Sequence, residues 1–149
     1  MFELFKKKPK KSSFQTELIN LSDYSQQIYN NIEIILDSIK NKRFHFSLDM
    51  TRSTYSFATN LNSRISNLDY RLKEIASSNV DIFKNLEEFK YKTFLVSDFL
   101  HDLIIFSPEE IEIDPFFYYV LDGCKDLIAS TVVFLNNLLN YVNKITNNS

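Results

Sequence analysis

The sequence predicts an all-α fold, an antiparallel up-down four-helix bundle with long helices. Hydrophobic residues make up 44% of the 149-residue chain, which is too apolar for a disordered protein. One glycine and three prolines leave little turn material for a many-stranded sheet. Four segments repeat apolar residues at alternating steps of four and three, as packed helices do. The length is close to the commonest size of a single domain, so we expect one helical domain over residues 14–149.

The first and last helices have the most regular repeats. The last is predicted over residues 117–145, with Phe117, Leu121, Cys124, Ile128, Thr131, Leu135, Leu138, Val142 and Ile145 on one face. The first is predicted over residues 14–40, with Phe14, Leu18, Leu21, Ser25, Ile28, Ile32, Ile35 and Ile39 on one face. At about 1.5 Å per residue the last helix is roughly 42 Å long, so it needs partners of similar length.

The middle of the chain predicts two further helices. The second runs over residues 47–77 with Met50, Phe57, Leu61, Ile65, Leu68, Leu72 and Ile75 inward. The third follows with Ile82, Leu86, Phe89, Thr93, Val96, Leu100 and Leu103 inward. Ser77, Ser78 and Asn79 offer a turn and a new cap between them, and without that turn the two helices would fuse into one rod. We expect the turn.

Residues 106–115 are predicted as the one sizeable loop, bracketed by Pro108 and Pro115. Asp114 and Pro115 form a suitable N-cap and first-turn pair for the last helix. Because the other connections are short, the four helices should alternate up and down.

Residues 1–13 are predicted as a flexible basic arm, because Pro9 discourages a helix from running through them. The arm contains apolar Phe2 and Phe5, followed by five cations: Lys6, Lys7, Lys8, Lys10 and Lys11. One interpretation is a peripheral anchor, with the aromatic residues in the membrane interface and the lysines facing anionic lipid. The other is a solubilising terminus whose aromatic residues fold back on the bundle.

Charge and composition exclude several functions. The arm leaves 12 basic and 18 acidic residues in the body, a net charge of −6 that should repel nucleic acid. A single cysteine, Cys124, allows no intrachain disulfide and suits a reducing cytoplasm. The only glycine, Gly123, rules out the usual Gly-rich phosphate loops. The apolar stretch over residues 116–139 contains Asp122, Lys125 and Asp126, so no transmembrane segment is expected.

The sequence offers no convergent catalytic set. Of the two histidines, His45 lies just before the predicted second helix and His101 lies on the third, and a di-iron bundle would need two Glu-x-x-His pairs. Cys124 sits on an apolar face and is predicted to be a small buried hydrophobe. We therefore expect a protein that is not an enzyme.

Three carboxylate pairs spaced four residues apart are candidate metal ligands: Glu33 with Asp37, Asp98 with Asp102, and Asp122 with Asp126. Up-down threading places all three pairs near one end of the bundle. Such pairs supply adjacent oxygen ligands for a divalent cation or iron. The alternative is that they are ordinary solvated helix faces.

Pieces of the sequence resemble the PhoU-like phosphate-transport regulators. The resemblance lies in residues 2–8, in Phe106-Ser107-Pro108, and in Leu121-Asp122 with Asp126. It implies an all-α, non-enzymatic regulator that binds metal and acts beside a membrane transporter. It also implies that Asp122 and Asp126 are metal ligands, with Asp98 and Asp102 matched less closely. The chain is too short for the six helices of that family.

The four aromatic residues Phe116, Phe117, Tyr118 and Tyr119 exceed what one core face accepts, which indicates an interface at the start of the last helix. The leading hypothesis is a non-catalytic protein-interaction module, of the regulator, adaptor, or inhibitor and immunity type, that binds a protein partner or itself. The alternatives are a PhoU-like metal-binding regulator at a membrane transporter, and a cytoplasmic protein held peripherally at anionic membranes by its arm.

Overall fold

The computed structural model describes the backbone of residues 2–76 and 79–148 and the side chains of residues 14–76 and 79–146. Six helices and no strand occur in these backbone ranges, which confirms the predicted all-α class. They are α1 (Phe2–Lys40), α2 (Phe44–Ser66), α3 (Leu68–Ala76), α4 (Val80–Leu103), α5 (Pro108–Ile113) and α6 (Phe116–Asn148). None of the helices so described combines the length and apolarity that crossing a bilayer requires.

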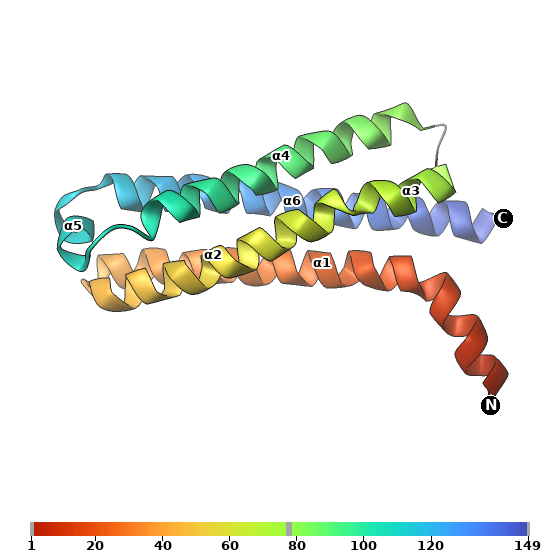
Figure 1. The fold of residues 1–149 in the computed structure, drawn as a ribbon, viewed down its shortest axis with the longest axis horizontal. Coiled ribbons are helices and arrows are strands. Elements are labelled where there is room, and N and C mark those ends of the chain that lie inside the picture. The colour runs from red at the N-terminus through yellow and green to blue at the C-terminus, as the bar shows by residue number, and fades with distance from the viewer. Residues whose placement is uncertain (1, 77–78, 149) are drawn as a thin grey trace.

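The long helices run side by side, and each packs against two others (Figure 1). Helix α1 contacts α2 and α6, and α4 contacts α2 and α6. Helix α3 continues the direction of α2, and the short helix α5 lies at the opposite end of the molecule from the two chain termini (Figure 1). The core therefore lies along the common axis, where the apolar faces of α1, α2, α4 and α6 meet.

The apolar stripes predicted for the first and last helices are confirmed. In α1 every predicted position from Phe14 to Ile35 is buried, and in α6 every predicted position from Phe117 to Val142 is buried. The last position of each stripe, Ile39 or Ile145, is only partly buried, because the helix there extends toward solvent.

The predicted second helix is wrong in two respects. It is interrupted at Asn67, whose N–H bonds to the carbonyl of Arg64, so α2 and α3 replace one helix of 31 residues. Its first half also has a different buried face: Thr51, Thr54 and Ala58 are buried, whereas the predicted Met50 and Phe57 are half-buried. The small residues fit a close helix contact, and the hydroxyls of Thr51 and Thr54 bond to carbonyls four residues earlier, at 2.7 Å each.

The predicted separation of the second and third helices is confirmed. Helix α3 ends at Ala76, and α4 begins at Val80 with Asn79 as its N-cap. The Asn79 side chain accepts a hydrogen bond from the N–H of Ile82 at 3.2 Å, as a cap should. The predicted turn residues Ser77 and Ser78 lie outside the described residues. A salt bridge between Lys90 and Asp69 ties α4 to α3.

The predicted loop over residues 106–115 contains a helix, α5. The side chain of Ser107 accepts from the N–H of Glu110, and the Glu110 side chain accepts from the N–H of Ser107. This reciprocal capping box, with Pro108 at the first turn, nucleates the helix, and buried Ile111 holds it against the core. Asp114 then accepts from the N–H of Phe116 at 3.0 Å, which confirms the predicted start of the last helix.

The prediction that Pro9 stops the helix in the arm is wrong, because α1 begins at Phe2. A proline inside a helix removes one hydrogen bond and bends the helix more often than it ends it. Figure 1 shows the N-terminal part of α1 bending away from the other helices. The side chains of the arm, which include Phe2, Phe5 and all five lysines, lie outside the described residues, so their membrane or partner contacts stay a prediction.

Candidate functional site

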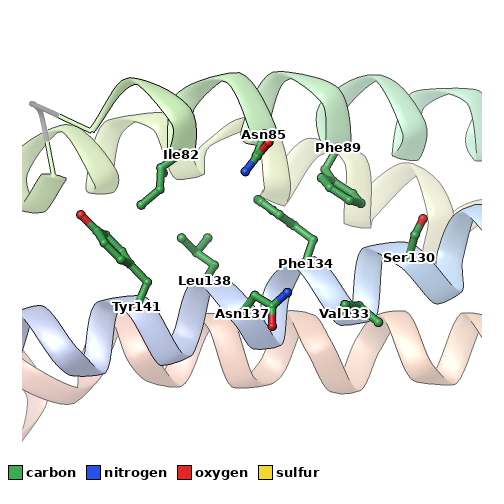
Figure 2. A pocket seen from close by; sticks show the side chains of 9 residues that line it. All are labelled: Ile82, Asn85, Phe89, Ser130, Val133, Phe134, Asn137, Leu138 and Tyr141. Carbon is green, nitrogen blue, oxygen red and sulfur yellow. The ribbon is translucent and has the colours of Figure 1, made fainter.

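A groove of about 470 Å³ lies between α4 and α6, toward the end of the molecule that holds the chain termini (Figure 1). Figure 2 shows its lining. Three residues come from α4 and six from α6: Ile82, Asn85, Phe89, Ser130, Val133, Phe134, Asn137, Leu138 and Tyr141. None of these nine residues carries a charge at neutral pH.

Two stacked aromatic rings, one from α4 and one from α6, lie at the groove. Phe89 and Phe134 stack with their ring centroids 4.2 Å apart and their planes inclined by 11°. Beyond this pair, α4 diverges from α6 toward its N-terminus (Figure 1). Leu138 and Phe134 form an apolar floor, only 4% and 8% exposed, while Val133 on the rim is 58% exposed.

Polar groups border the apolar floor. The amide of Asn79 donates to the hydroxyl of Tyr141 at 3.0 Å, which links the start of α4 to α6 at one end of the groove. The exposed Asn85 and Asn137 lie on the two opposite helices, and Asn85 reaches from α4 toward Phe134 (Figure 2). Lys92 lies 4.6 Å from the centroid of the Phe89 ring, at the end where the helices converge.

The lining is suited to binding an apolar ligand. Its polar groups are amides and hydroxyls, and among the lining residues only Tyr141 is titratable. Uncharged donors and acceptors around an apolar floor fix the orientation of an apolar ligand without transferring a proton or a group.

The chain was compared with models of protein families, with curated proteins and with solved structures. No match was found in any of the three. The resemblance to PhoU-like regulators therefore stays a prediction.

The structure brings together only part of the predicted acidic set. Glu33 and Asp37 on α1 and Asp122 on α6 border one shallow pocket of about 280 Å³. Lys40 and Lys125 border the same pocket, and the Lys125 ammonium lies 3.9 Å from an Asp122 carboxylate oxygen. These lysines already supply the counter-charge that a metal ion would provide.

The other predicted ligands lie elsewhere. Asp98 and Asp102 are exposed on α4, which packs against α2 and α6 and not against α1, and Asp126 is exposed on α6. Over the described residues, no three side chains of His, Cys, Asp or Glu converge as a metal site requires. Metal binding by these pairs stays a prediction.

The predicted aromatic interface is divided between core and surface. Phe116 and Tyr119 are 54% and 69% exposed, and Tyr118 lies half-buried under the Lys40 ammonium. The prediction is wrong for Phe117, which is fully buried and packs edge-on against Phe106. Its heptad position explains this, because it opens the core stripe of α6.

No residue that lines the groove was predicted as part of a functional site. Ile82, Phe89 and Leu138 were assigned to the core, and the other six lining residues were not singled out. One signal was readable: Val133, Phe134 and Tyr141 lie beside the core stripe of α6, so the apolar face of this helix is wider than one partner needs.

Cys124 is buried in the core, as predicted. Burial raises the pKa of its thiol from 9.0 to about 12, so the thiol stays protonated and unreactive at neutral pH. His45 and His101 are exposed on α2 and α4 respectively, and His101 packs against the ring of Tyr55 with centroids 5.5 Å apart.

Proposed function

We propose that this protein is a non-catalytic protein-interaction module of the regulator, adaptor or inhibitor type, and that its α4–α6 groove binds an amphipathic helix of a protein partner. We also propose that its scaffold is an antiparallel up-down four-helix bundle in which α2 and α3 together act as one of the four helices.

The observation that carries the binding proposal is the uncharged, apolar lining of the groove. From Ser130 to Tyr141 the lining covers 12 residues of α6, a rise of roughly 16 Å or about three helical turns. A helix laid along this length would place apolar residues at i, i+3 or i+4, and i+7 on the floor.

The lining also defines the chemistry of the occupant. A charged side chain on the floor would lose its water without gaining a counter-charge, which is strongly unfavourable. The contacting stripe must therefore be apolar. Uncharged polar residues on its flanks would bond to the exposed amides of Asn85 and Asn137.

A photo-crosslinking amino acid at position 137 tests the proposal in the full chain, expressed in its source cells. The side chain there is exposed and borders the groove, so a bound helix lies within reach. We expect crosslinks to a peptide with apolar residues at helical spacing. The control position is Ile34 on α1, which is 47% exposed and lies outside the groove. Equal crosslinking at both positions, or no peptide crosslinked at position 137, would contradict the proposal.

A second experiment uses a charge on the rim. Val133→Asp should abolish the crosslink at position 137 while leaving the unfolding temperature nearly unchanged, because the side chain is 58% exposed. Ile34→Asp is the matched control and should leave the crosslink intact. A crosslink that survives Val133→Asp would show that the occupant does not use the groove.

A further inference from the structure

We infer that the helix bound in this groove is the N-terminal part of α1 from a second copy of the chain. The inference rests on the proposed function of the groove and names its partner. Two features at the same end of the molecule motivate it. One is the N-terminal part of α1, which bends away from the other helices (Figure 1). The other is the groove between α4 and α6, which no segment of the described chain fills.

Among the helices of the described backbone, none lies beside the N-terminal part of α1 (Figure 1). Figure 1 shows it bending away from α2, α4 and α6. An isolated helix of about 12 residues is marginally stable in water, and most helical stability in proteins comes from packing an apolar face. A partner surface would therefore stabilise this segment in the helical form that α1 has from Phe2 onward.

The sequence of the segment is amphipathic in a helical register. At about 100° per residue, positions 2, 5 and 9 fall within roughly 60° of one another, and they hold Phe2, Phe5 and Pro9. Lys7 and Lys11 fall on the opposite side, roughly 150° to 170° from the centre of this stripe, and Lys6 flanks it. The segment therefore presents the uncharged stripe that the groove requires.

Length and charge agree with this pairing. Residues 2–13 of a helix are roughly 17 Å long, close to the roughly 16 Å of the groove. Residues 1–13 carry a net charge of +4, whereas residues 14–149 carry −6. The segment of one copy is therefore attracted to the body of another, with its lysines remaining in solvent around the rim.

The geometry favours exchange between two copies. The segment bends away from the body on the side of α1 and not toward α4, so it does not approach the groove of its own chain (Figure 1). Two copies related by a twofold axis can each place this segment in the other's groove. In such a reciprocal exchange each copy fills the groove of the other, so no groove or segment stays free and assembly stops at the dimer.

The test is the mass of the full chain in solution by light scattering over a concentration series. We expect a dimer. Phe2→Ser with Phe5→Ser should weaken association by about 10- to 100-fold for each lost aromatic contact. Val133→Asp should also yield a monomer. Ile34→Asp, on α1 outside the groove, is the matched control and should retain the dimer, and circular dichroism should show all variants folded. Replacing the five lysines of residues 6–11 with glutamine should weaken the dimer less than the serine changes, because it removes charge attraction but no apolar contact. A full chain that is monomeric throughout, or a dimer unaffected by the serine changes, would overturn the inference.

The crosslink at position 137 separates this inference from the proposed function. Capture of residues 2–13 of a second copy supports both. Capture of a helix from another protein by a monomeric chain overturns the inference and leaves the proposed function standing. A monomer that yields no peptide crosslink, and binds phosphatidylglycerol vesicles only while the lysines are present, overturns both and makes the segment a membrane anchor.

Discussion

Helix α6 forms two seams of different character, a closed one with α1 and an open one with α4. Along the closed seam, Gln15 donates to Asn143 at 2.6 Å and Ser22 donates to Asn136 at 2.9 Å, so polar side chains bridge the two helices outside the core. Along the open seam, the stacked rings of Phe89 and Phe134 are followed by the groove.

The difference shows that a continuous apolar stripe does not by itself close a helix pair. The apolar residues in the core stripe of α6 are buried from Phe117 to Val142, along the contact with α1 and along the contact with α4 alike. On the closed seam α1 and α6 contact each other more extensively than α4 and α6 do. On the open seam two aromatic rings meet, and the helices stay farther apart because interiors pack at fixed density around such bulky groups.

The largest expected effect is the difference in thiol-labelling rate at pH 9 between a core position of α6 and a position on the exposed rim of the groove. With its pKa raised to about 12, Cys124 has about 500-fold less thiolate than an unfolded cysteine at this pH. A cysteine in Val133→Cys, on the exposed rim, should label far faster, as mass spectrometry of the modified peptides would measure. Similar rates at the two positions would mean that the core of α6 opens as readily as the groove.

The raised pKa of the Cys124 thiol also makes the free energy of unfolding depend on pH. The unfolded thiol releases its proton near pH 9, whereas the native thiol keeps it to about pH 12. The unfolded state therefore binds fewer protons in this range, and the contribution of Cys124 to the free energy of unfolding falls as pH rises from 9 to 12. Cys124→Ala is the control, and its stability should fall less over the same range.

Leu21→Ala in the closed part of the core should lower the free energy of unfolding by about 2–5 kcal/mol, because it leaves a cavity where the side chain is fully buried. Urea denaturation measures the change. A loss below about 1 kcal/mol would show that this part of the core collapses around the missing side chain and is less tightly packed than the structure indicates.

Phe134→Leu tests whether aromatic stacking holds the open seam apart. The change keeps an apolar side chain but removes the stack on Phe89, so we expect a loss below about 1.5 kcal/mol. The groove should narrow as α4 approaches α6, which distance measurements between spin labels at exposed positions 84 and 140 would detect. An unchanged distance would mean that another contact sets the spacing.

Val133→Ala should have the smallest effect, within about 0.5 kcal/mol of the original stability at concentrations where the chain is monomeric, because the side chain is 58% exposed on the groove rim of the single chain. Thermal unfolding of the isolated protein would measure it. A clearly larger loss would indicate that the rim is covered in solution, and a dependence of that loss on protein concentration would attribute the cover to a second copy.

The sequence by itself determined the all-α class, the first helix from Phe14 onward, the last helix and the buried stripes along both. These follow from local periodicity, since Leu21 or Ile128 faces the core in any packing that buries the apolar side of its helix. Helix α5 was equally local, because the capping box of Ser107 and Glu110 is legible in the sequence, although the two prolines led to a loop assignment.

Only the tertiary structure decided which helix seams close. Whether Thr51 or Met50 is buried depends on how closely the neighbouring helices approach α2, and that distance depends on side chains far away in the sequence. The groove has the same origin, since Phe89 and Phe134 come from different helices and the space beside them exists only when both rings meet. Periodicity assigns a residue to a face, but the sizes of the side chains on both partners determine whether that face is covered.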